Sequence, residues 1–391
     1  MKLSRFSLFG FLLIAGPAST QTLKVEPTPN PAASGSAQVN LSLTQDGSPI
    51  LSWIEPQKDG SFAFRYSIGH GGHWALPRTI AAHRRFFHHP AEMPNMTALK
   101  DGTLIAEWIE QPNKEGEAES EAEFVYVSAS ADGVKWSTPS MASHDRSQNQ
   151  HGLASIIATG DHEASIFWLQ ALKGEDGPVS LMRSTIGSKG TELKEEDLDS
   201  DVCSCCPTSA VRTARGLLVA YRDHTKENIR DISVIRDENG KWTTPKSIYP
   251  DKWKIDACPV NAASASAQGD KVGISWYTAS GDKARVEFTS SLDGGATFRK
   301  MSVVSTGQAY GYTAAAVDDT GGAVVSWLER GDNGARLLVR YVSSAGVPGP
   351  VTQVAEGTRK DLGYPRLARS GNDVWIAWNS ASKVQTARLT K

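Results

Sequence analysis

The sequence predicts an all-β chain folded as a β-propeller of four-stranded antiparallel blades, with seven blades the favoured number. Three observations predict this fold. A hydrophobic strand that ends in Trp or Tyr recurs seven times, a Gly/Asp turn precedes each copy, and a second strand usually follows. A lone four-stranded sheet of about fifty residues leaves both faces unburied until neighbours stack on it, so repetition at this length is typical of propeller blades.

The repeated strands end in aromatic residues that lie 51 to 60 positions apart. In chain order they are Trp53, Trp108, Trp168, Tyr221, Trp276, Trp327 and Trp378. Side chains alternate between the two faces of a strand, so we expect these aromatics at equivalent positions on the second strand of each blade. The last copy, residues 364–391, has room for only three strands, and we expect the segment around Thr22 to Val25 to supply the fourth. The alternative is six blades, with the first copy as an appendage.

The N-terminus has the features of a secretory signal peptide over residues 1–19. Lys2 and Arg5 precede an apolar run that ends at Ala15, and small residues follow. Residues 20–36 then form an N-terminal arm, and residues 37–391 form a single propeller. No later apolar stretch approaches the length of a membrane span, so we expect an exported monomer, periplasmic or extracellular. The formal net charge of -2 provides no basic field for nucleic acid.

One turn is distinctive. Residues 291–298 read Ser-x-Asp-x-Gly-x-Thr-Phe directly after a strand-like run. The Asp293 side chain can accept hydrogen bonds from nearby backbone amides, and glycine supplies positive φ. Weaker copies of this spacing lie at 67–74, 130–136 and 237–242. The pattern, called an Asp-box, resembles the turns between outer strands of sialidase-like propellers.

Polar and aromatic residues that could bind a ligand gather in the loops where propellers form their ligand sites. The loop that leads into each innermost strand, here called the lead-in loop, opens over the central channel, as does the loop after the second strand. Channel candidates in these positions are His88, His89, Glu92, His151, Asn261, Tyr310, Tyr312, Tyr364 and Arg366, and the group that follows Tyr221 is Arg222, Asp223, Arg230 and Asp231. A structural polar contact explains any one of them alone, and their shared position around one axis favours function.

Four short stretches extend the resemblance. Residues 203–208 read Cys-Ser-Cys-Cys-Pro-Thr, and Tyr-Arg-Asp, Ile-Arg-Asp-Ile and Cys-Pro-Val-Asn begin at Tyr221, Ile229 and Cys258. Together they resemble a bacterial family of exported sialidase-like propellers with BNR (Asp-box) repeats, commonly labelled exo-α-sialidases. The similarity extends from about His88 to Arg366. It implies a propeller that acts on or binds glycans, with a carbohydrate or small acidic ligand in the central channel and no cofactor.

A sialidase requires three arginines that clamp the substrate carboxylate, a tyrosine nucleophile beside a glutamate, and an aspartic acid as proton donor. The candidates are Arg222, Arg230 and Arg366 for the clamp, Tyr312 or Tyr364 with Glu92, and Asp223 or Asp231 as the acid. The Arg-Ile-Pro motif of sialidases is absent, and both Arg-Asp pairs could be structural. Hydrolysis and binding alone therefore both remain open.

The cysteines form a second signal, because all four lie in two successive lead-in loops. In an exported protein an even number of cysteines favours disulfides, and we expect at least one bridge from Cys258 to the Cys203–Cys206 segment. The alternative is a soft-metal site that binds copper or zinc through Cys203, Cys205, Cys206 and His151. That alternative predicts a non-catalytic periplasmic propeller that binds a metal or a partner protein.

Overall fold

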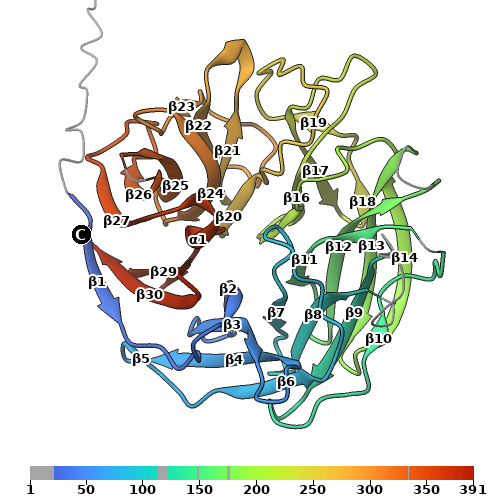
Figure 1. Ribbon diagram of the computed structural model, residues 1–391. Coiled ribbons are helices and arrows are strands. Elements are labelled where there is room, and N and C mark those ends of the chain that lie inside the picture. Colours follow the sequence, from blue (N-terminus) through green and yellow to red (C-terminus); the bar gives the residue numbers. More distant parts are fainter. Residues whose placement is uncertain (1–21, 112–121, 148, 174–176, 333) are drawn as a thin grey trace, which may run out of the picture.

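The computed structural model describes residues 22–111, 122–147, 149–173, 177–332 and 334–391. The predicted signal peptide, residues 1–19, lies outside this described part of the chain. Seven antiparallel sheets stand around a central axis, which confirms the seven-bladed propeller and excludes the six-bladed alternative (Figure 1). No helix within the described ranges is long and apolar enough to cross a membrane.

Blades one to six run outward from the axis in chain order, and blade seven takes its outer strand from the N-terminal segment. Blade one is β2 (Ala37–Leu43), β3 (Pro49–Pro56) and β4 (Phe62–His70), with its outer strand in two pieces, β5 (His73–Trp74) and β6 (Arg78–Ala82). Blade two is β7 (Asn95–Ala98), β8 (Leu104–Glu110), β9 (Phe124–Ser130) and β10 (Ser140–Met141). Blade three is β11 (His151–Ala158), β12 (Glu163–Ala171), β13 (Val179–Gly187) and β14 (Glu192–Asp199).

The remaining blades follow the same plan. Blade four is β15 (Ser209–Thr213), β16 (Gly216–Arg222) and β17 (Ile232–Glu238), with outer pieces β18 (Lys241–Trp242) and β19 (Lys246–Ser247). Blade five is β20 (Ser264–Gln268), β21 (Lys271–Thr278), β22 (Arg285–Ser291) and β23 (Ser302–Val303), with a 3₁₀ turn at Ser280–Asp282. Blade six is β24 (Ala309–Val317), β25 (Ala323–Gly331), β26 (Gly334–Val342) and β27 (Thr352–Gly357). Helix α1 (Arg359–Leu362) leads into blade seven, which is β28 (Arg366–Ser370), β29 (Asp373–Ser380), β30 (Lys383–Thr390) and β1 (Lys24–Thr28).

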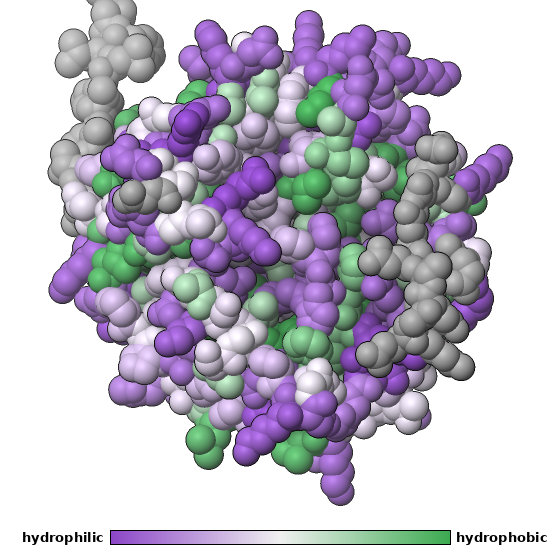
Figure 2. All heavy atoms as spheres, in the orientation of Figure 1, coloured by the Kyte–Doolittle hydropathy of each residue, from purple (hydrophilic) through white to green (hydrophobic). Residues whose placement is uncertain are grey.

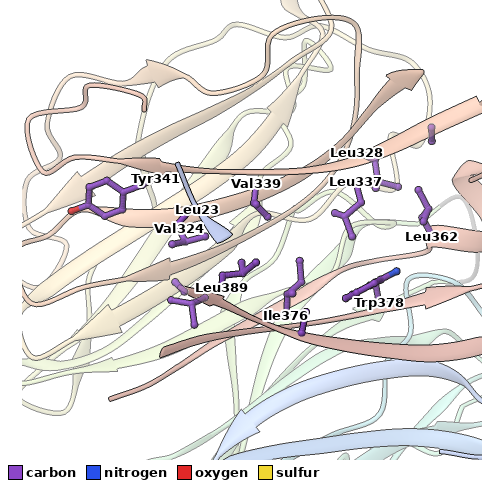
Figure 3. Packing of buried hydrophobic residues seen from close by; sticks show 14 residues of the cluster. Leu23, Val324, Leu328, Leu337, Val339, Tyr341, Leu362, Ile376, Trp378 and Leu389 are labelled. Carbon is purple, nitrogen blue, oxygen red and sulfur yellow. The ribbon is translucent and has the colours of Figure 1, made fainter. Parts of the chain in front are cut away.

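The ring is closed by the two ends of the chain. Strand β1 pairs antiparallel with β30, and Lys24 lies opposite Thr390. Leu23, directly before β1, is buried in a hydrophobic cluster with Val339 of β26 and Leu389 of β30 (Figure 3). The N-terminal segment thus supplies the strand that the short final repeat lacks.

The seven repeated aromatics all lie on second strands and are buried, as predicted. Four of the seven tryptophan and tyrosine side chains bond their polar atom through one contact that repeats around the ring, whereas Trp378 Nε1 is buried without a partner among the described residues. The indole nitrogens of Trp53, Trp108, Trp168 and Trp327 donate to Glu55, Glu110, Gln170 and Glu329, two residues further along the same strand. Residues i and i+2 share one face of a strand, so each acceptor reaches its indole without distorting the sheet.

Hydroxyl groups tie neighbouring blades together around the axis. Backbone amides of Ala158, Ala265, Ala315 and Val317 donate to the side-chain oxygens of Thr97, Ser209, Ser264 and Ser266 on the preceding blade. The donor-acceptor distances are 3.2, 3.0, 3.2 and 3.0 Å. Innermost strands form no backbone ladder with each other, so these bonds satisfy amides that would otherwise face the channel.

The turn at 291–298 has the expected hydrogen bonds. The Thr297 amide and hydroxyl donate to Asp293, at 2.9 and 2.7 Å, and Ser291 Oγ donates to the same carboxylate at 2.7 Å. Partial burial would raise the pKa of Asp293, but these hydrogen bonds outweigh it and lower the pKa to about 2. The Gly294 amide donates to Asp270 in the turn after the innermost strand, which places both turns on one face.

The end of the propeller seen in Figure 2 shows mainly hydrophilic side chains with small hydrophobic groups between them. The large hydrophobic residues that are exposed are Leu76, Val134, Leu172, Leu193, Leu292, Val303 and Val347, spread over several blades. Scattered exposure of this kind is ordinary for a globular protein.

Candidate functional site

The lead-in loops of blades four to seven meet at one end of the channel. Asn261 connects three of these blades. Its backbone amide donates to Cys206 Sγ at 3.4 Å, and its side-chain Oδ1 accepts the Tyr312 amide at 2.8 Å. Its Nδ2 donates to the Tyr310 carbonyl at 3.2 Å. With both ends of its side chain in use, Asn261 is a structural connection between loops.

Four residues that begin innermost strands have the left-handed backbone conformation. They are Gln38, Leu153, Val260 and Tyr312, with φ angles of 51°, 57°, 45° and 50°. Non-glycine residues adopt this conformation at a cost, and such residues concentrate at sites where the fold dictates the direction of side chains. These four residues with positive φ all lie at the lead-in end of the channel.

Arg222 belongs to the framework of this end. Its Nη2 donates to the carbonyls of Asn261 and Tyr277, at 3.1 and 2.9 Å, and its Nη1 donates to the Arg230 carbonyl at 2.6 Å. The guanidinium also stacks over Trp253, 5.1 Å from the ring centre. Each nitrogen is bonded to the backbone and the side chain is only 1% exposed, so Arg222 is not placed as an open carboxylate clamp.

The other two arginines of the expected clamp have different partners. Arg230 Nη1 lies 3.3 Å from Cys203 Sγ. Arg366 Nη2 lies 3.1 Å from Met93 Sδ, and its Nε is buried without a partner among the described residues. Burial lowers the pKa of Arg366 to about 10. The three guanidinium groups thus occupy three distinct environments.

The tyrosine and glutamate candidates are also separated. The Tyr364 hydroxyl donates to the Val260 carbonyl, and its ring meets Tyr312 edge to face at 4.4 Å. Burial raises the pKa of Tyr364, which opposes formation of a phenolate nucleophile. Glu92 instead accepts the Leu153 amide at 2.7 Å. Burial, reinforced by the neighbouring Glu123 carboxyl, raises the pKa of Glu92.

Both aspartate candidates support local backbone. Asp231 accepts the amides of Lys252 and Trp253, at 2.8 and 3.0 Å. Asp223 accepts the Ser233 hydroxyl at 2.7 Å and the His224 amide at 2.8 Å. Burial raises the pKa of Asp223 despite these bonds. The structural explanation of these two acids, left open by the sequence, therefore accounts for their contacts.

The candidate histidines already have hydrogen-bond partners in blades one to three. His151 is fully buried, with Nδ1 donating to the carbonyls of Glu123 and Asn149, at 3.0 and 2.8 Å, and Nε2 lies 3.2 Å from Asp145 Oδ2. His88 Nδ1 bonds Gln38 Oε1 at 3.1 Å, and His89 Nδ1 accepts the Ala91 amide at 3.2 Å. Tyr310 lies half-buried on β24, under the guanidinium of Arg359 at 5.6 Å.

Three cysteine sulfurs converge in the lead-in loop of blade four, and we call Cys203, Cys205 and Cys206 the cysteine cluster. Cys203 Sγ lies 3.8 Å from Cys205 Sγ and 3.9 Å from Cys206 Sγ. Hydrogen bonds from these two thiols hold the pKa of Cys203 far below its ordinary value, and the Arg222 charge acts in the same direction. Cys203 and Cys206 are buried, and Cys205 is half-buried.

Two expectations about the cysteines require correction. All four cysteines are free thiols in the structure, so the bridge expected between Cys258 and the cluster is not formed. Cys258 is exposed, outside the group of sulfurs that lie within 4.8 Å of one another. His151 does not belong to that group either, because both its ring nitrogens are directed at groups in blades two and three. The sulfur atoms alone make up the cluster.

A cavity of about 580 Å³ follows the axis and is lined by the innermost strands of all seven blades. At the lead-in end its lining includes Met93, Pro207 and Arg366, of which Met93 and Pro207 are buried. At the other end the lining residues are exposed: Gln45, Lys100, Asp161, Arg212 and Gln268. The cavity therefore opens on the face of the turns that follow the innermost strands, opposite the face on which we expected the ligand.

Sequence reasoning missed several residues that shape this site. Met93, Leu153 and Val260 pack with Tyr364 and Tyr312 in one hydrophobic cluster at the lead-in end. A single apolar residue in a loop has no distinguishing pattern, and the positive φ of Leu153 or Val260 leaves no mark in the residue type. The Trp-x-Glu spacing was visible in the sequence and could have identified the buried acceptors.

No protein-family model matches the chain, and no curated protein matches its sequence. Solved structures do resemble it. A lectin, BP39L from Burkholderia pseudomallei, aligns over 92% of this chain and 97% of its own, with 15% identity and a TM-score of 0.62. The polysaccharide lyase Uly1 aligns over 90% and 89%, with 8% identity and a TM-score of 0.53.

A further polysaccharide lyase, a PL25 ulvan lyase bound to -[GlcA(1-4)Rha3S]-, aligns over 93% of each chain, with 12% identity and a TM-score of 0.52. At these identities the likeness establishes the fold. The chain is thus similar in fold to carbohydrate-binding and carbohydrate-cleaving propellers, and its own chemistry has to be inferred from its own residues.

Proposed function

We propose that this protein is an exported binding propeller that holds a small anionic carbohydrate in its central channel and does not hydrolyse it. The observation that carries the proposal is Arg366. Arg366 lines the channel cavity, and its buried Nε has no partner within the described chain. A buried arginine nitrogen without an acceptor is costly, and a carboxylate or sulfate oxygen of a ligand would satisfy it.

The charges of the cavity favour an anion. Its lining includes Lys100, Arg212, Arg366 and Arg369, against the single acid Asp161. Lys100 is paired with Asp161 at 3.1 Å, and Arg369 lies 3.6 Å from Asp319, whereas Arg212 and Arg366 have no acidic partner within 4.0 Å among the described residues. Two arginines therefore remain to attract a negatively charged ligand into a low-dielectric channel.

The hydroxyl groups of the cavity suit a sugar. Thr97, Ser209, Ser264 and Ser266 line the channel and accept backbone amides through their oxygen atoms. A hydroxyl that accepts one bond keeps its own hydrogen as a donor. The channel can therefore offer donors to ligand oxygens at several heights, and its volume lies in the range of small-ligand sites, roughly 300–1,000 Å³.

Binding without hydrolysis is supported by the positions of the expected catalytic groups. Arg222 is bonded to carbonyls, Tyr364 donates to a carbonyl, and Glu92 accepts the Leu153 amide. A phenol without a neighbouring base is a weak nucleophile near neutral pH. Carbohydrates are the first anionic class to test because the similar solved propellers include a lectin and two polysaccharide lyases.

The test is a binding comparison between matched glycans. The chain that begins at residue 20 is titrated calorimetrically with oligosaccharides that carry a uronic or sialic acid and with neutral counterparts. We expect the acidic members to bind, and Arg366→Met to weaken binding at least about thirtyfold. Thermal unfolding of Arg366→Met should be unchanged or higher, since the substitution removes a buried charge without an acidic partner.

Arg299→Ala is the matched control, because Arg299 is an exposed arginine beyond the cavity lining. It should bind the acidic glycan like the unaltered protein. Equal affinity for neutral and acidic glycans contradicts the anionic ligand. Turnover of a fluorogenic sialoside that Arg366→Met abolishes contradicts the absence of hydrolysis.

A further inference from the structure

The cysteine cluster has the dimensions of a metal site. An ion bound about 2.3 Å from three sulfurs in one plane separates each pair of sulfurs by about 4.0 Å. The measured Sγ–Sγ distances from Cys203 are 3.8 Å to Cys205 and 3.9 Å to Cys206. All three sulfurs lie within 4.8 Å of one another, whereas a disulfide requires about 2.05 Å. The thiols are thus spaced to share one ion.

The loop that carries the cluster is fixed at both ends. The Cys203 amide donates to the Arg222 carbonyl at 3.1 Å. At the other end, Thr208 donates its amide to the Leu153 carbonyl of blade three at 3.0 Å and its hydroxyl to the Phe167 carbonyl at 3.2 Å. Cys206 Sγ in addition accepts the Asn261 amide from blade five. Three blades therefore hold the ligands, and ligands held in advance lose little entropy when an ion binds.

The surroundings supply positive charge to a sulfur-rich centre. Arg230 Nη1 lies 3.3 Å from Cys203 Sγ, and Arg222, whose Nη1 donates to the Arg230 carbonyl, lies beside it. Three thiolates around one monovalent cation carry two net negative charges, which two guanidinium groups can balance. Hydrogen bonds from arginine and from the Asn261 amide to ligand sulfurs are outer contacts of the kind that orient metal ligands.

The donor set selects the metal. Within the described residues the group consists of three sulfurs, with no imidazole or carboxylate oxygen within the same 4.8 Å. Thiolates prefer soft ions, of which Cu(I) accepts three-coordinate geometry, whereas structural zinc sites are almost always four-coordinate. A site of three thiolates in a rigid, mostly buried loop therefore favours monovalent copper.

We propose that Cys203, Cys205 and Cys206 bind one Cu(I) ion as three thiolates, with Arg230 as a positioning residue. Binding forms three copper–sulfur bonds and releases to solvent the protons that the thiols still hold, and the oxidation state of copper does not change. The site is separate from the proposed glycan cavity, whose lining contains none of the three cysteines. Loss of one activity therefore leaves the other measurable.

The experiment is an anaerobic Cu(I) titration of the reduced chain that begins at residue 20, in competition with the colorimetric chelator bicinchoninic acid. We expect one Cu(I) per chain, with sulfur as the sole ligand by X-ray absorption. Cys205→Ser should weaken binding more than about 100-fold, since it removes one ligand outright. Cys205 is the half-buried member of the cluster, so this variant is the one best placed to keep the fold, which its melting temperature will check.

Cys258→Ser is the matched control, because it makes the same substitution at an exposed thiol outside the cluster. Its Cu(I) affinity should equal that of the unaltered chain, while Arg230→Met should weaken binding about tenfold. Cu(I) that does not bind stoichiometrically overturns the proposal. So does one Zn(II) per chain that Cu(I) fails to displace, or a native disulfide between Cys258 and a cluster cysteine.

Discussion

At the scale of single residues, Glu329 is a buried carboxylate with several hydrogen-bond donors around it. Glu329 is 1% exposed and accepts the indole N–H of Trp327 at 3.1 Å, the amides of Thr306 and Gly307 at 2.9 Å each, and Arg336 at 3.1 Å. The Thr306 hydroxyl donates to the same carboxylate at 3.2 Å, and a carboxylate, which accepts and never donates, suits donors that converge in this way.

We predict that Glu329→Gln destabilises the protein although the glutamine side chain has nearly the same shape as glutamate. The NH2 group of the new glutamine points at N–H groups that donate to Glu329 in the unaltered protein. At least one buried N–H is then unsatisfied, at a cost of about 1–3 kcal/mol. The measurement is the denaturant-induced unfolding of the variant beside that of Glu227→Gln, at an exposed glutamate. An equal loss of stability in both variants would contradict the role given to the Trp-x-Glu contact.

At the scale of elements, blade two carries a group of buried acids on the side of blade three. Glu107 of β8 is 1% exposed, and burial raises its pKa to about 8. Glu123, just before β9, has its pKa raised to about 7 by burial, and Glu92 faces both of them. These carboxyls are neutral in the folded protein over a pH range in which the unfolded chain ionises them.

This difference predicts a loss of stability as the pH rises. A carboxyl whose pKa is higher in the folded state stabilises the fold fully below its unfolded pKa, about 4.3, and this contribution is lost as the pH rises through the folded pKa. The unfolding free energy should therefore decline between about pH 4.5 and pH 8.

Glu107→Gln provides the test of that decline. The amide resembles the neutral acid, so the variant should match the unaltered protein at pH 5 and decline less steeply towards pH 8. The measurement is the melting temperature over that range. Parallel curves for the two proteins would show that Glu107 is ionised in the folded state.

At the scale of the whole molecule, stability depends on a ring that the chain ends must close. Leu23 is 3% exposed and packs against residues of blades six and seven, and Thr352 of β27 donates its hydroxyl to the Leu23 carbonyl at 2.9 Å. Arg388 of β30 pairs with Glu26 of β1 at 2.9 Å. One short strand thus joins the first and last parts of the sequence.

Leu23→Ala should destabilise the whole propeller by about 2–5 kcal/mol, because it opens a cavity at the closing contact. Leu76→Ala makes the same truncation at a side chain that is 87% exposed and should have little effect. Thermal unfolding of both variants distinguishes them. A small effect of Leu23→Ala would mean that β1 does not hold the ring.

The fold was predictable because propellers repeat their burial. Trp53, Trp276 and Trp378 are buried at equivalent positions in three different blades, and seven such positions along the sequence predict seven blades. The site was less predictable, since the residue type of an arginine at a strand end does not show whether it bonds carbonyls, as Arg222 does, or lines a cavity, as Arg366 does.

The cysteines include one arrangement that the sequence could predict and one that it could not. Cys203, Cys205 and Cys206 are near one another in the sequence and could be expected to lie close together, and the structure brings their sulfurs within 4.8 Å of one another. The relation of Cys258 to them depends on how two loops from different blades are oriented. That orientation is set by long-range contacts such as the Asn261 amide on Cys206 Sγ, which no local pattern encodes.

The pairing of β1 with β30 has a consequence for biosynthesis. Lys24 is synthesised 366 residues before its partner Thr390. At about 5–20 residues per second, the first strand waits about 20–70 s for its neighbour. During this interval the seventh blade cannot be completed, and a nascent chain that stops early leaves an unpaired strand edge at its beginning. The closing strand thus couples closure of the ring to the synthesis of β30.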